Sequence, residues 1–149
     1  MTDRFAKAAR DGTTHVDGFN QISQGLLPGH MGIEFTHMEP DRIEAFLQIE
    51  QHHLNPSGFL HGGTVVSLAD TLAGYATVIN LPEGATGFTT IELKTNFLST
   101  AANGKLFGRA KPLHIGRSTQ VWDVETWREA DQKITAHFRC TQMVFFAKG

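Results

Sequence analysis

Hydrophobic and polar residues alternate along much of this chain, which is the pattern of β-strands that bury one face. Residues 31–38 and 42–50 alternate on either side of the turn sequence Glu39-Pro40-Asp41 and are predicted to form a hairpin. Four further strand-like stretches, separated by turn residues, follow residue 86. They are residues 87–98, 105–112, 117–129 and 133–146. Because strands that follow one another usually pair, we expect an antiparallel meander.

Between the hairpin and these strands the pattern changes from alternation to a helix. Residues 51–62 are rich in His, Gly, Pro and Asn and are expected to form a loop. Residues 63–79 contain no lysine, arginine or glutamate, so this helix is predicted to be buried nearly all round until Asn80 and Pro82 end it. The order of elements indicates an α+β domain in which one curved sheet wraps around one helix. Such a sheet keeps open edges, which favours a homodimer.

Residues 1–29 are a lead-in to this domain, which we place at residues 30–149. The first fifteen residues are polar, and residues 19–27 are predicted to form a short helix that ends at Pro28-Gly29. A chain of 149 residues has room for one domain and can bury a core without disulfides or metals.

Composition narrows the classes of function. The chain is 40% apolar and 19% charged with a net charge of -2 and no basic stripe, so we expect no nucleic-acid partner. The single cysteine, Cys140, excludes an intrachain disulfide and is expected to be a small core residue. The chain shows no signal-peptide core and no apolar stretch of about 18 residues, which predicts a cytoplasmic protein without a membrane partner. Neither the histidine spacing of a helical zinc site nor a serine elbow is present, and no metal or cofactor is expected.

The first candidate for chemistry is His61-Gly62-Gly63, at the start of the long helix. Free backbone N–H groups and the positive end of the helix dipole gather there, and glycines leave those groups uncovered. A thioester carbonyl bound at this point would be polarised, and the oxyanion formed on attack would be stabilised. The alternative is that the two glycines only shape a tight turn into the helix.

Asp70 is the one carboxylate on this otherwise uncharged helix. A buried carboxylate is costly, so it is either paired or functional. Asp70 follows Gly63 by nearly two turns, about 10 Å along the axis, which is too far to act on a carbonyl bound at its own helix N-terminus. Two such helices lying antiparallel across a twofold axis would bring each Asp70 to the other subunit's glycines. The alternative is a structural acid bonded to a threonine or to the backbone.

Two residues of the preceding loop are further candidates. Asn55 has the groups to hold a water or the thioester oxygen, but an Asn-Pro pair more commonly forms a turn. His61 has the chemistry of an acid or base, but it can equally orient the loop through ring hydrogen bonds. His52 and His53 lie nearby in the sequence, although adjacent side chains point in different directions.

These residues together resemble the hotdog-fold thioesterases of the phenylacetic-acid-pathway (PaaI) type. The likeness rests on Asn55-x-x-Gly58-x-x-His61-Gly62-Gly63 followed by Asp70 in a helix of small residues. It covers residues 30–146, because residues 87–99 resemble the family's strand after the helix and residues 113–118 resemble its Gly-Arg turn.

The resemblance implies a hotdog fold, with five to six antiparallel strands wrapped around the helix, and an acyl-CoA substrate. It also implies a homodimer, often paired as a dimer of dimers, with active sites between subunits. In this family Asp70 would be general base or nucleophile, and the N–H of Gly62, with Gly63, would form the oxyanion hole. Asn55 and His61 would position water and thioester, and Thr90 would help to hold the water.

The resemblance further implies that Gly116 and Arg117 lie where the coenzyme A phosphates pass, with Lys94, Arg109 or Lys111 adding positive charge. The long lead-in departs from the family pattern, and a helix there would cap the acyl pocket. Two other functions stay open: a hotdog hydratase or dehydratase, and a non-catalytic acyl-CoA-binding protein.

Overall fold

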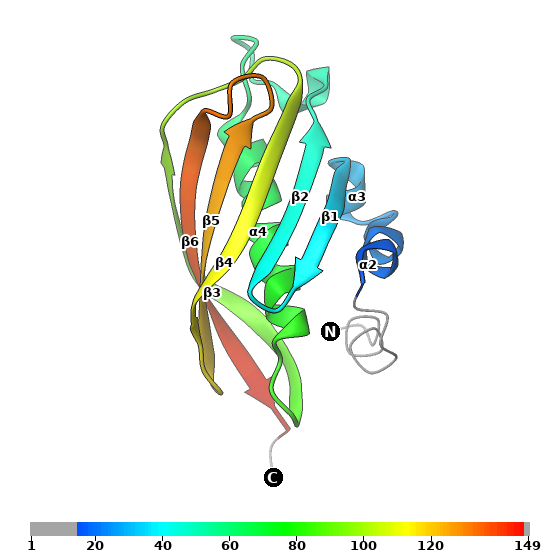
Figure 1. Ribbon diagram of the computed structural model, residues 1–149, viewed down its shortest axis with the longest axis vertical. Coiled ribbons are helices and arrows are strands. Elements are labelled where there is room, and N and C mark those ends of the chain that lie inside the picture. The colour runs from blue at the N-terminus through cyan, green and yellow to red at the C-terminus, as the bar shows by residue number, and fades with distance from the viewer. Residues whose placement is uncertain (1–14, 148–149) are drawn as a thin grey trace.

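The computed structural model describes residues 15–147, and within them one antiparallel sheet of six strands curves around a long helix (Figure 1). The helices are α2 (Val16–Ser23), α3 (Leu27–His30) and α4 (Gly62–Ile79), with a 3-10 turn at Gln51–His53. The strands are β1 (Ile33–Glu39), β2 (Arg42–Gln48), β3 (Ala85–Phe97), β4 (Lys105–Ile115), β5 (Thr119–Arg128) and β6 (Ile134–Phe146). The expected α+β fold, with a sheet wrapped around one helix, is confirmed.

The strand order is β1-β2-β4-β5-β6-β3, so the predicted meander of four consecutive strands is wrong at its first member. The hairpin β1–β2 and the run β4–β5–β6 pair as expected, but β3 pairs with β6 at the opposite edge from β1. The cause is α4, which packs across the concave face of the sheet and contacts all six strands. The chain therefore leaves the helix on the far side of the sheet, and β4 returns to pair with β2.

Helix α4 buries one side and leaves the other partly open. Its fully buried residues include Leu68 and Leu72, which pack with Leu106 and Trp122 of the sheet in the same core. Five residues at helical spacing remain partly exposed: Val66, Ser67, Asp70, Thr71 and Gly74. The prediction of burial nearly all round is thus wrong along this stripe, because the sheet covers only one side of the helix.

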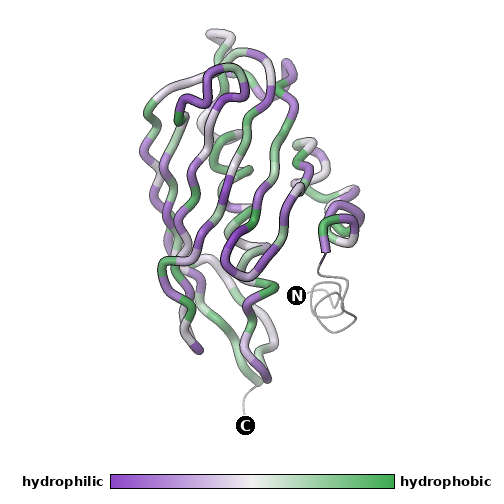
Figure 2. Tube along the Cα trace, viewed as in Figure 1, coloured by the Kyte–Doolittle hydropathy of each residue, from purple (hydrophilic) through white to green (hydrophobic). Residues whose placement is uncertain are grey.

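The alternation of hydrophobic and hydrophilic positions is visible along the strands (Figure 2). In β3 it is interrupted by a bulge between Thr90 and Glu92. Before the bulge Thr90 pairs with Gln142, and after it Leu93 pairs with Cys140; both partners are fully buried beneath α4. Directly paired residues share a face of the sheet. The extra residue therefore keeps Thr90 and Leu93 on the same inner face although they are three positions apart.

A second irregularity extends β4. The strand was predicted to end at Pro112, but it continues to Ile115 through a register shift between Pro112 and His114. The shift lets the chain absorb a residue that cannot donate a ladder hydrogen bond.

The described part of the lead-in packs onto the sheet. Phe19 of α2 is fully buried and meets Tyr75 of α4 edge to face, with ring centroids 4.9 Å apart, and Ser23 Oγ lies 2.7 Å from the Tyr75 hydroxyl. The single helix predicted at residues 19–27 is instead two, and Pro28 does not end a helix but lies in the first turn of α3, where no N–H is needed. Residues 1–14 of the lead-in lie outside the described residues. Among the helices described, none is long and apolar enough to cross a membrane.

Candidate active site

The N-terminus of α4 shows why two consecutive glycines stand there. The His61 ring caps the helix, its Nδ1 accepting a hydrogen bond of 2.9 Å from the Gly63 N–H. A Cβ on Gly63 would lie 2.9 Å from that Nδ1, so only glycine leaves room for the cap. A Cβ on Gly62 would instead lie 3.1 Å from the Phe97 ring. His61 therefore takes the orienting role that the sequence left open, and each glycine accommodates a different ring.

The two N–H groups differ in what they are free to bind. The Gly63 N–H is engaged by His61, whereas the Gly62 N–H meets no acceptor within residues 15–147. A donor at the first position of an 18-residue helix carries the partial positive charge of the helix end. Of the predicted pair, only Gly62 thus has an N–H without an acceptor in this part of the chain, and Gly63 serves the cap.

Asn55 lies in the loop at this same end of α4. Its Oδ1 accepts hydrogen bonds from the backbone N–H groups of Ser57, at 2.9 Å, and Phe59, at 3.3 Å. The Asn-Pro pair forms a turn, as one of the two alternatives predicted, and the hydrogen bonds of this turn fix the Asn55 side chain. With Oδ1 engaged in the turn, the amide NH₂ is the part of Asn55 left to meet a ligand.

The loop is tied down by a residue whose importance the sequence did not reveal. His53 is 1% exposed, and its carbonyl accepts hydrogen bonds from the His61 N–H, at 2.9 Å, and the Thr64 hydroxyl, at 2.9 Å. Its Nδ1 accepts from the Glu50 N–H at 3.0 Å. Burial, and next the charge of His52, lower the pKa of the His53 imidazole, so the ring stays neutral. The His-His pair offered a signal, but only the fold shows which of the two is buried.

Asp70 lies in the middle of the open stripe of α4 and is half-buried. Burial raises the pKa of its carboxyl above the ordinary value, against a smaller lowering by a hydrogen bond from Thr90. That bond joins Thr90 Oγ1 to Asp70 Oδ1 at 3.5 Å, at the long end of the range. The structure thus brings Asp70 and Thr90 together, and it leaves the carboxylate without a cation partner among the described residues.

Two buried residues lie on the inner face of the sheet on the Asp70 side of the helix. Cys140 is fully buried; burial first, and then the nearby Asp70 charge, raise the pKa of its thiol to about 12. Its predicted place in the core is confirmed. The neighbouring Gln142 donates to the Cys140 sulfur at 3.4 Å. Asp70 therefore borders neutral groups on this side, which favours a carboxyl that accepts protons readily.

Gly116 and Arg117 are not brought to either of these clusters within one chain. They form the β4–β5 turn, at the opposite end of the molecule from the start of α4 (Figure 1). The Arg117 guanidinium lies 5.0 Å from the centroid of the Phe146 ring. The predicted residues therefore form three groups: Asn55, His61, Gly62 and Gly63 at one end, Asp70 and Thr90 in the middle, and Gly116 and Arg117 at the other end.

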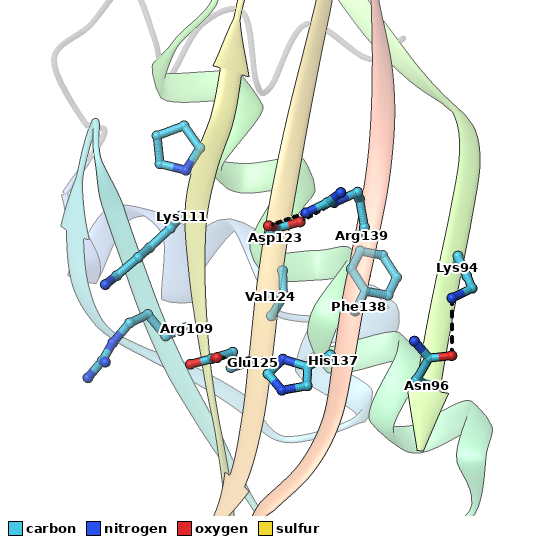
Figure 3. Close-up of a pocket in the computed structure, with 11 residues that line it drawn as sticks. Lys94, Asn96, Arg109, Lys111, Asp123, Val124, Glu125, His137, Phe138 and Arg139 are labelled. Carbon is cyan, nitrogen blue, oxygen red and sulfur yellow. Dashed lines mark hydrogen bonds and ion pairs between the residues drawn. The ribbon is translucent and has the colours of Figure 1, made fainter. Parts of the chain in front are cut away.

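A hollow of about 490 Å³ lies on the outer face of the sheet, away from α4 (Figure 3). Lys94, Arg109 and Lys111 line it together with acidic residues. Arg139 is bonded there to Asp123, at 2.7 Å for one of its nitrogens. None of the candidate catalytic groups lines this hollow; Asp70 and Thr90 lie instead on the inner side of the sheet, between α4 and β3. Within the described residues no cluster of three or more His, Cys, Asp or Glu side chains could hold a metal.

The comparisons with known proteins agree with this fold. The model of the thioesterase superfamily matches residues 57–135, which include the loop, α4 and the following strands. A solved thioesterase from Haemophilus influenzae is 31% identical, with a TM-score of 0.83 over 89% of this chain and 91% of its own.

Two curated relatives are named as a CoA hydrolase and a thioesterase. The 1,4-dihydroxy-2-naphthoyl-CoA hydrolase of Escherichia coli is 32% identical over 76% of this chain and 83% of its own length. The proofreading thioesterase EntH of Klebsiella pneumoniae is 32% identical over 76% of this chain and 82% of its own. The chain therefore belongs to the thioesterase superfamily. It is a hotdog-fold thioester hydrolase.

Proposed function

We propose that this enzyme hydrolyses acyl-CoA thioesters, with aryl or fatty acyl groups, to the free acid and coenzyme A. The observation that carries the proposal is the placement of two complementary groups on the open side of one helix. The Gly62 N–H is a free, polarised donor suited to an oxyanion, and Asp70 is a half-buried carboxylate with a raised pKa. Both lie beside β3, one of the two edge strands of the sheet.

One chain does not bring these two groups to a common substrate. They are eight residues apart along α4, which corresponds to about 12 Å of axial rise. A second copy, related by a twofold axis with the two α4 helices antiparallel, brings each Asp70 to the other copy's Gly62. The open edge of β3 supports this arrangement, because it leaves unpaired backbone groups and the exposed side chain of Ile91. We infer a homodimer with shared sites, paired further as a dimer of dimers.

In the proposed reaction the thioester carbonyl oxygen accepts a hydrogen bond from the Gly62 N–H. Asp70 takes a proton from water, whose oxygen bonds to the carbonyl carbon while the carbonyl π electrons move to oxygen. The oxyanion then collapses, the C–S bond breaks, and the coenzyme A sulfur leaves with the electron pair and takes up a proton. In the alternative, Asp70 itself attacks the carbonyl carbon, and water then hydrolyses the resulting anhydride.

The other predicted residues support this reaction. Asn55 donates from its amide NH₂ to the thioester or to water, His61 holds the α4 N-terminus in shape, and Thr90 orients Asp70 or its water. Gly63 allows the His61 cap. Gly116 and Arg117 are proposed to meet the coenzyme A phosphates of the site shared with the other subunit, since they lie at the end of α4 that an antiparallel partner's Gly62 would approach.

The first test measures thiol released from benzoyl-CoA and hexanoyl-CoA by the wild-type protein and by Asp70→Asn. Asparagine keeps the shape and the hydrogen bond with Thr90 but cannot take the proton, so we expect kcat to fall about 10²- to 10⁴-fold. Wild-type turnover by Asp70→Asn would refute the mechanism. Tight acyl-CoA binding without thiol release would indicate a binding protein, and hydration of an enoyl-CoA would indicate a hydratase.

The second test asks whether the site is shared between subunits. Asp70→Asn and Gly62→Pro, which removes the N–H, are each expected to be inactive alone. When equal amounts of the two proteins are combined and allowed to exchange subunits, half of the dimers are mixed and each of these holds one intact site, so about a quarter of wild-type activity should return. No recovery, in a mixture shown by mass spectrometry to have exchanged, would place the whole site within one chain.

A further inference from the structure

Phe97, at the end of β3, lies against the backbone of Gly62. A Cβ built on Gly62 would be 3.1 Å from Phe97 Cζ and 3.5 and 3.6 Å from the two Cε atoms, so the ring meets the helix end with its tip. Phe97 pairs with the buried Ala136 of β6, which places it on the inner face of the sheet, the same face as Thr90. The bulge after Thr90 is what turns Phe97 to this side.

The ring is placed where a bound thioester would meet it. More than half of the Phe97 side chain, 54%, is exposed, although it stands next to the free Gly62 N–H. Leu93, on the same face, is 42% exposed and continues the apolar surface along β3. An exposed aromatic ring beside a polarised donor is costly in water unless a ligand covers it.

We propose that Phe97 is a specificity-determining residue that favours acyl groups with an aromatic ring attached directly to the thioester carbonyl. This inference rests on the proposed function, because it takes the carbonyl oxygen to be bound at Gly62. The carbon next to that oxygen then carries its substituent beside the Phe97 ring. An aryl substituent is held nearly coplanar with the carbonyl by conjugation and presents a flat face or edge to the ring, whereas an alkyl chain gains only contact area.

The test is the ratio of kcat/KM for benzoyl-CoA to that for hexanoyl-CoA, measured in wild type and in Phe97→Leu. Leucine keeps an apolar side chain but removes the aromatic contact, so we expect the ratio to fall about three- to tenfold. Phe145→Leu is the matched control, since Phe145 is also a partly exposed phenylalanine, 41% exposed. It lies near the end of β6, where it pairs with Gly87, and not beside Gly62. Phe97→Tyr, which keeps the ring, should retain the wild-type ratio.

Several outcomes would overturn the inference. An unchanged ratio in Phe97→Leu would do so, as would an equal loss with both substrates, which would place the ring against the coenzyme A arm. The same fall in Phe145→Leu would show that the effect is not local. Wild-type protein that released no thiol from either substrate would overturn the proposed function itself, whereas normal turnover with an unchanged ratio would overturn only the role of Phe97.

Discussion

Replacing Gly62 by proline and, separately, by alanine isolates the contribution of one backbone N–H. Proline is compatible with this position, because it is the first residue of α4 and the preceding His61 has φ −69° and ψ 136°, an extended conformation that residues before proline prefer. The Gly62 N–H donates to no group in the described part of the chain, so its removal breaks no internal hydrogen bond.

The two variants share the steric disturbance of an added Cβ. Each adds a Cβ that would lie 3.1 Å from Phe97 Cζ, a few tenths of an ångström inside ordinary contact, and the half-exposed ring can yield by that amount. Only proline removes the donor. Loss of one oxyanion donor typically costs about 10²- to 10³-fold in kcat, or about 2.7–4 kcal/mol, so we expect the proline variant to fall below the alanine variant by that factor.

Steady-state thiol release gives kcat and KM for both variants, and thermal unfolding shows that both are folded. The expected pattern is a large difference in kcat with similar KM and similar melting temperatures, because the donor acts on the transition state. Equal kcat values for proline and alanine would refute the assignment of Gly62 as the oxyanion donor.

Two further predictions follow from the protonation states. Because burial raises the pKa of Asp70, the folded state binds this proton more tightly than the unfolded state, and the charged carboxylate lowers stability at pH values above its folded pKa. Asp70→Asn should therefore melt at a higher temperature than wild type at pH 7, and the difference should vanish at acidic pH, below both pKa values. An equal or lower melting temperature of Asp70→Asn at pH 7 would contradict this. Cys140, fully buried and with its pKa raised to about 12, should not react with a thiol reagent in the native protein and should give one thiol per chain in denaturant; rapid labelling of native protein would show that the inner face of the sheet is open.

The sequence pointed to candidate functional groups more directly than to the strand topology. Asp70 stood out because it is a carboxylate on an uncharged helix, and His61-Gly62-Gly63 because glycines before a helix expose donors. The hairpin and α4 followed from local patterns. The position of β3 did not, because its pairing with β6 depends on where α4 releases the chain, which is a long-range property.

The inner face of β3 could not be read from alternation either. A regular strand that turns Thr90 inward would also turn Glu92, Lys94 and Asn96 inward, and the bulge reverses this. Phe97 was missed for that reason, and His53 was missed because its burial comes from contacts made by the folded loop.

The bulge makes β3 two short strands of opposite phase joined end to end. The segment before it delivers the Thr90 hydroxyl to Asp70, and the segment after it delivers the Phe97 ring to Gly62. On the proposed function, the two halves of the strand carry separate tasks, bond cleavage and choice of acyl group. Exchanging residues 92–97 with those of another thioesterase should then change the preferred substrate while the contact between Asp70 and Thr90 stays intact. This half of the strand is therefore a natural unit for engineering.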